Sequence, residues 1–130
     1  MKPSDFFTRG KANEGEKLPL SLPDGTPTDE YLMVRGVDSD AFRAAVDNYR
    51  RELIGFAAIK DESERAAKSE QARVELMCAL VIGWSFDDEC TQEALAELFR
   101  EAPHIADEAD KFASDRRRFF RKRSTGSQKD

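Results

Sequence analysis

The stretch that decides the fold class runs from residue 17 to residue 36 and reads KLPLSLPDGTPTDEYLMVRG. Its first part alternates Leu18, Leu20 and Leu22 with proline and serine, a period of two that predicts a β-strand. A PDGT turn then leads to the apolar run YLMV, which predicts the second strand of a hairpin. Because Pro19 has no N–H to donate, we expect the first strand to lie at the edge of a sheet.

The spacing of apolar residues changes after this hairpin. From Ser39 onward they recur every three or four positions, which predicts an amphipathic helix capped by Asp38 or Ser39 and ending near Gly55. The apolar positions of this helix are Phe42, Ala45, Val46, Tyr49, Leu53 and Phe56.

Three further helices are predicted from their start signals. Asp61 can cap a second helix, Thr91 a third, and Pro103 suits the first turn of a fourth. We extend the second helix to residue 84 and the fourth to residue 123 because apolar residues continue at helical spacing. The apolar residues of these helices are Met77, Leu80, Val81 and Trp84, then Leu95, Leu98 and Phe99, then Ile105, Ala109, Phe112, Ala113 and Phe120.

These elements predict a mainly α fold of the α+β type, with an N-terminal β-hairpin followed by about four helices. We expect a flexible arm at residues 1–16 and a disordered tail at residues 124–130. Between them lies one domain at residues 17–123, with the hairpin at 17–36 and the helices at 39–123. Four large side chains are expected in its core: Phe42, Leu80, Trp84 and Phe99.

The composition limits the class of protein. The chain has 130 residues, enough for one core, and 36% of them are charged, with a net charge of −5. It contains no run of the roughly 20 apolar residues that cross a bilayer and no secretory signal, so we expect a soluble protein with no membrane partner. An acidic chain is also a poor general binder of nucleic acid, which needs a basic face.

Residues that could perform chemistry are few. Cys78, Cys90 and His104 lack the paired close spacings of a structural zinc site, and no signature identifies either cysteine as a nucleophile. The acids at residues 87–89 precede a helix cap, where solvation and the helix dipole explain them. The glycines form no phosphate-binding loop. We therefore expect no enzyme activity, no metal and no cofactor.

Charge is distributed unevenly along the chain. Residues 87–110 hold nine acids against Arg100 alone, whereas residues 111–130 hold eight bases against Asp115 and Asp130. Within the basic part, the segment RRRFFRKR at residues 116–123 places an aromatic pair among six cations. Such a segment can complete the C-terminus of a helix, bind an acidic protein surface, or stack on bases and neutralise phosphates. The residues alone leave these three interpretations open.

The adjacent phenylalanines of this segment carry the prediction of a binding site. Neighbouring positions of a helix lie about 100° apart around its axis, so Phe119 and Phe120 cannot both face the core. One ring is expected to be partly exposed, with arginine stems covering apolar surface around it. We predict that a partner protein binds at Phe112, Arg116, Arg117, Phe119, Phe120 and Arg121.

Six short segments follow one another along the chain in an order that can be compared with known families. They are LPLSLPDGT at 18–26, VRGVDS at 34–39, GWSF at 83–86, EALAELF at 93–99, PHIA at 103–106 and RFF at 118–120. As an ordered set, across roughly residues 3–123, the chain resembles the tail assembly chaperones of bacteriophages with long, non-contractile tails (siphophage type). No single segment is specific for that family.

The resemblance implies a function that composition does not. Such a chaperone works in the cytoplasm of the infected bacterial host, binds the tape measure protein, keeps it soluble, promotes assembly of the tail tube around it, and is absent from the mature virion. Family members also self-associate, and many have a longer frameshifted form that recruits the tail tube protein. The family shares no catalytic residue. The alternative from another class is a small phage nucleic-acid-binding regulator that uses residues 116–123.

Overall fold

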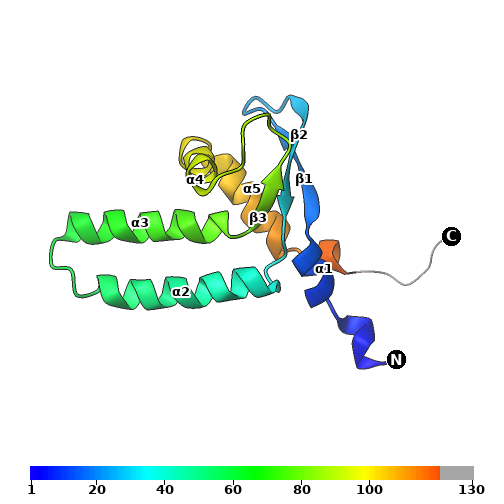
Figure 1. Cartoon of the computed structure of the whole chain (residues 1–130), viewed down its shortest axis with the longest axis horizontal. Coiled ribbons are helices and arrows are strands. Elements are labelled where there is room, and N and C mark those ends of the chain that lie inside the picture. Colours follow the sequence, from blue (N-terminus) through cyan, green and yellow to red (C-terminus); the bar gives the residue numbers. More distant parts are fainter. Residues whose placement is uncertain (121–130) are drawn as a thin grey trace.

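The structure, a computed structural model, describes residues 1–120 and has the expected α+β fold (Figure 1). A β-hairpin near the N-terminus is followed by helices, as predicted, and a third strand completes the sheet. In chain order the elements are the 3-10 helix η1 (Pro3–Phe6), α1 (Arg9–Glu14), β1 (Glu16–Ser21), β2 (Pro27–Val34), α2 (Asp40–Phe56), α3 (Glu62–Cys78), β3 (Val81–Trp84), α4 (Gln92–Glu101), α5 (Pro103–Ser114) and the 3-10 helix η2 (Arg116–Phe119).

The sheet is antiparallel, and its strands lie in the order β1-β2-β3. Leu32 in the central strand pairs with Leu18 on one side and with Trp84 on the other. The edge position predicted for the strand that contains Pro19 is therefore confirmed. In the hairpin turn, Gly25 has a φ of 93°, a conformation that glycine adopts without steric cost.

The strand β3 replaces a predicted helical segment. We extended the second helix to Trp84, but α3 ends at Cys78 and residues 81–84 pair with β2. The apolar spacing here suits a helix and a strand equally. The strand forms because its pairing with β2 completes the sheet beside Leu32 and Val34, which are both fully buried. The β-branched pair at residues 81 and 82 is the local signal for a strand.

Three helix starts agree with the sequence. Ser39, Asp61 and Thr91 cap α2, α3 and α4, and each side chain accepts a hydrogen bond from a backbone N–H two or three residues later. These bonds satisfy N–H groups that have no partner within the helix. The helices α2 and α3 form a long hairpin that projects from the rest of the molecule (Figure 1).

The core lies where the sheet meets α5 and the inner ends of the other helices. Three of the four predicted core residues are buried, with Leu80 at 0%, Phe99 at 3% and Phe42 at 8% exposure. Trp84 is only half-buried and packs against the edge of this core, its ring 5.2 Å from that of Phe86. Its indole Nε1–H donates to the carbonyl oxygen of Asp88 at 2.7 Å, which satisfies its polar atom.

The last helix is shorter than predicted. We expected it to run to residue 123, but α5 ends at Ser114 and the chain continues into η2. Asp115 separates the two because its carboxylate accepts a hydrogen bond from the backbone N–H of Arg117, capping η2. The 3-10 geometry buries Phe119 to 1% exposure and leaves Phe120 at 42%. One exposed ring was predicted, although within an α-helix.

The N-terminal segment also differs from the prediction of a flexible arm over residues 1–16. Residues 9–14 form α1, and Ala12 is buried at 1% exposure. The N–H of Gly36 donates to the carbonyl of Ala12 at 3.0 Å, and a Cβ on Gly36 would lie only 2.8 Å from the Ala12 Cβ. This close backbone contact joins residues distant in sequence, so no local pattern reveals it. The tail predicted at residues 124–130 lies outside the described residues.

Candidate functional site

The largest group of exposed apolar side chains lies where the N-terminal segment meets η2. Phe6 is 68% and Phe7 66% exposed, Phe120 is 42% exposed, and Met1 is fully exposed. A groove of about 800 Å³ opens among these side chains. It is lined by Met1, Asp5, Phe6, Thr8, Arg116, Arg117 and Phe120.

A second hollow of about 510 Å³ shares Phe6 and Thr8 with the first. Its remaining lining consists of Phe7, Arg9, Gly10, Asp38 and Arg43. We call the two hollows together the aromatic groove. Its walls come from opposite ends of the described chain, and its rim contains four arginines.

The local backbone explains why the N-terminal phenylalanines are exposed. Pro3 suits the first position of η1, and the carboxylate of Asp5 accepts a hydrogen bond from the N–H of Lys2 at 2.8 Å. This one-turn helix buries none of its residues. Phe6 and Phe7 are therefore displayed at its end instead of packing in the core.

Asp38 ties the two walls of the groove together. Its carboxylate accepts hydrogen bonds from the Thr8 hydroxyl at 2.9 Å and from Arg116 Nε and Nη2 at 2.7 and 2.9 Å. The Arg116 guanidinium holds the pKa of Asp38 below its ordinary value because it bonds to the charged form. One side chain just before α2 thus contacts both terminal segments.

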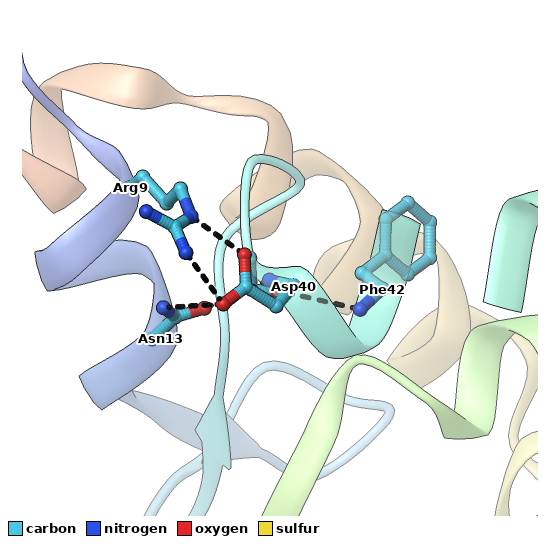
Figure 2. A network of polar contacts seen from close by, with 5 residues as sticks. Arg9, Asn13, Asp40 and Phe42 are labelled. Carbon is cyan, nitrogen blue, oxygen red and sulfur yellow. Dashed lines mark hydrogen bonds and ion pairs between the residues drawn. The ribbon is translucent and has the colours of Figure 1, made fainter. Parts of the chain in front are cut away.

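Asp40 makes the second tie (Figure 2). Arg9 donates to its carboxylate through Nε at 2.6 Å and Nη2 at 3.0 Å, and the backbone N–H of Asp40 donates to Asn13 Oδ1 at 2.8 Å. The hydrogen bonds from Arg9 lower the pKa of Asp40. These contacts join α1 to the first turn of α2 beside the groove.

Two of the predicted binding residues lie in the core instead of on a surface. Phe112 is 8% and Phe119 is 1% exposed, and their rings meet edge to face with centroids 6.0 Å apart. The Arg118 guanidinium lies 4.6 Å from the Phe112 ring centroid, a cation–π distance. Phe119 is almost completely covered, whereas Phe112 keeps 8% exposure and lines a hollow of about 300 Å³, so the structure places both rings in the core and their contact with a partner stays a prediction.

Three other predicted residues do lie together. Arg116, Arg117 and Phe120 line the same groove, whereas Arg121 lies outside the described residues. Both arginines are already paired, Arg116 with Asp38 at 2.7 Å and Arg117 with Asp115 at 3.0 Å. A guanidinium held by a carboxylate is less available to a phosphate, which applies to these two residues of the segment.

Sequence reasoning missed the N-terminal wall of the groove. Phe6 and Phe7 belong to the arm predicted at residues 1–16, through which docking was expected, but they were not included in the predicted binding site. The contacts that place them pass through Asp38 and Asp40. The signal that could have identified them is the pair itself, because two adjacent large apolar residues in a polar segment indicate an exposed interaction site.

Both cysteines of the chain lie in the described part, and burial affects each of them. Burial raises the pKa of Cys78 to about 11, which keeps the thiol protonated at neutral pH, and burial also raises the pKa of Cys90. Within residues 1–120 no three His, Cys, Asp or Glu side chains are placed to hold a metal ion. None of the helices in this range is long and apolar enough to cross a membrane.

The acidic stretch predicted from the sequence forms an exposed surface. All nine acids between residues 87 and 110 are exposed, and none makes an ion pair with another residue in the range 1–120. The surface begins in the loop after β3 and continues over α4 and α5.

Comparisons of the chain with models of known families, with curated proteins and with solved structures gave no match.

Proposed function

We propose that this chain is a tail assembly chaperone of a long, non-contractile-tailed bacteriophage, acting in the cytoplasm of the infected bacterial host. In this function it binds the tape measure protein, keeps it soluble, and promotes tail tube assembly without remaining in the virion. A longer frameshifted form would bring in the tail tube protein. The proposal rests on the ordered segments that resemble this family and on one structural observation, the aromatic groove.

The groove has the chemistry that a helical client requires. A long helical protein exposes apolar ridges before it assembles, and these ridges need an apolar surface that excludes water. Phe6, Phe7 and Phe120 supply that surface at exposures of 42–68%. Arginine stems can extend it while their charged ends remain in water. Aromatic and arginine side chains are also those that most often dominate binding energy at protein interfaces.

The exposed aromatics are unusual for a chain that is otherwise dense in charge. Exposed apolar patches in soluble proteins mark interaction sites or aggregation hazards. In this chain the patch is held in a defined position by Asp38 and Asp40, whose ion pairs order both walls. A surface that is ordered and apolar loses little entropy when it binds, which favours a role in recognition.

The test is co-expression of the chain with the tape measure protein of the same genome. The wild-type chain should keep the tape measure soluble and co-purify with it. Phe6→Ser and Phe120→Ser should each reduce the co-purified amount about tenfold or more, as expected for loss of an aromatic anchor. Ile54→Ser is the matched control, because Ile54 is 76% exposed on α2 and does not line the groove.

Each variant is first shown to be folded by circular dichroism. A wild-type chain that leaves the tape measure insoluble would overturn the proposed function. If the wild type succeeds and the two groove variants bind as well as Ile54→Ser, the function stands and the groove is the wrong surface.

A further inference from the structure

The two edges of the sheet differ in how they are protected. An edge strand exposes unpaired backbone groups, and natural sheets usually blunt such edges with proline, charged residues or bulges. The β1 edge has all three, since it contains Pro19 and Lys17 and its pairing with β2 is irregular between Pro19 and Ser21. It is therefore a poor template for another strand.

The β3 edge has neither proline nor charge, although its pairing with β2 is also irregular, between Met33 and Val34. The strand reads VIGW, and within residues 1–120 it pairs with β2 alone. Ile82 is 44% exposed, and a Cβ built on Gly83 would have no heavy atom within 4 Å. Strand side chains project from the faces of a sheet, so these two values describe the faces beside β3. The edge itself is apolar and carries neither the proline nor the charge that usually blocks pairing.

The two ends of β3 carry opposite charges. Before the strand, Arg35 Nη1 donates to the carbonyl of Ala79 at 2.7 Å, and no acidic side chain among the described residues pairs with this arginine. After the strand come the three exposed acids of residues 87–89, none of which forms an ion pair with another residue in the range 1–120. Glu30 also lies at this end, where it accepts a hydrogen bond from the Ser85 hydroxyl at 2.7 Å.

We propose that two copies of this chain associate through antiparallel pairing of β3 with β3, forming one continuous six-stranded sheet across a two-fold axis. Antiparallel pairing brings the start of each strand beside the end of the other. The Arg35 end of one copy then meets the acidic end of its partner, and two-fold symmetry makes this contact twice. Parallel pairing would instead place like charges together.

This inference is independent of the tape measure and of the aromatic groove. A strand of four residues offers few backbone hydrogen bonds, so the dimer is weak and depends on protein concentration. We propose a second copy as the partner because the chain itself carries complementary charges at the two ends of β3. An extended segment from another protein would pair with the same edge without changing the mass of the purified chain.

The experiment measures the mass of the purified full chain by sedimentation over a range of concentrations. The wild type should pass from monomer to dimer. Ile82→Lys places a charge on the edge strand β3, as natural edge strands do to prevent pairing, and should raise the dimer dissociation constant about tenfold or more. The matched control is Ile54→Lys, an equal substitution at an exposed site on α2, which should leave that constant unchanged.

A charge reversal tests the second part of the argument. Changing residues 87–89 together to lysine should also weaken the dimer, because the new cations would face Arg35 of the second copy. Its control reverses three exposed acids on α4, Glu93, Glu97 and Glu101, and should have no such effect.

Hydrogen exchange provides the location. Amides of residues 81–84 should exchange more slowly at concentrations where the dimer forms. A monomer at every concentration would overturn the proposal. A dimer that Ile82→Lys leaves intact, or one in which both reversals act equally, would overturn it as well.

Discussion

Two adjacent phenylalanines of this protein belong to different regions, one to the core and the other to the aromatic groove. Phe119 is buried at 1% exposure against Phe112, whereas Phe120 is 42% exposed and lines the groove. Both belong to the same basic segment of the sequence, and only the turn of the backbone at η2 gives them opposite environments. Residue type alone therefore does not separate a packing residue from a binding residue here.

Different kinds of contact hold the core and the aromatic groove in place. Phe119 belongs to the apolar core cluster, which also contains Leu32, Leu80 and Ala113. The groove is held instead by polar ties from Asp38 and Asp40 to residues at both ends of the chain. Loss of an apolar contact should change the stability of the whole domain, and loss of a polar tie should act locally.

The sharpest test of this difference is truncation of each phenylalanine. Phe119→Ala should lower the free energy of unfolding by about 3–5 kcal/mol, because it leaves a cavity in a packed core. Phe120→Ala should change it by no more than about 0.5 kcal/mol, as exposed substitutions usually do. Chemical denaturation measures both. Equal effects of the two substitutions would contradict the separation of core and groove.

The sequence predicts those parts of the fold whose signals come from neighbouring residues. The hairpin, the caps at Ser39, Asp61 and Thr91, and the start at Pro103 depend on neighbouring residues, and all were confirmed. The strand β3 and the docking of α1 depend on distant partners. The apolar residues of β3 would also fit a helix, and pairing with the free side of β2 makes them a strand.

The core and the segment that leads from the groove meet at Gly36. A Cβ on Gly36 would lie 2.8 Å from the Ala12 Cβ and 3.0 Å from Phe119 Cγ, so α1, which leads from the groove, and the core ring meet there. Gly36→Ala should cost about 1–3 kcal/mol of unfolding free energy, the usual cost of overpacking.

Gly55 supplies the control for this substitution. It lies within α2, where an added Cβ meets open space, and alanine favours a helix over glycine by about 1 kcal/mol. Gly55→Ala should therefore raise the midpoint of thermal unfolding while Gly36→Ala lowers it. A neutral Gly36→Ala would mean that α1 shifts away easily and that its docking contributes little.

Trp84 lies between the two extremes, because it is half-buried at the end of β3. Trp84→Phe keeps an aromatic ring but removes the Nε1–H that donates to Asp88. The expected loss is about 0.5–1.5 kcal/mol, the net contribution of one hydrogen bond. Urea denaturation measures it, and a loss as large as that of Phe119→Ala would place Trp84 in the core, as first predicted.

The candidate site was less predictable than the fold. The sequence identified Arg116, Arg117 and Phe120 by the mixture of aromatic and basic residues, and these three do line the groove. It placed Phe112 and Phe119 with them because it assumed a continuous helix through residue 123. Phe6 was missed because its position depends on side-chain contacts of Thr8 with Asp38 and of Arg9 with Asp40, 30 and 31 residues apart, and polar residues carry no periodic signal of their partners.

The smallest expected effect is the response of the groove to acid. Asp38 and Asp40 have lowered pKa values in the folded chain, first because arginine bonds to their charged forms. A lowered pKa contributes stability that is present above the unfolded value near 4 and is lost as pH falls through the folded value. The polar ties should therefore be intact at neutral pH and weaken below about pH 4.

For Asp38 the loss is at most about 1 kcal/mol, because solvent screens an exposed ion pair. The expected result is local: hydrogen exchange at residues 8–14 should accelerate below about pH 4, while β2 stays protected. Asp38→Asn should produce the same change already at neutral pH. Asp47→Asn on the exposed side of α2 is the control, since Asp47 makes no ion pair among residues 1–120. If residues 8–14 stay protected in Asp38→Asn, apolar contacts around Ala12 hold this wall, and the groove depends on the core after all.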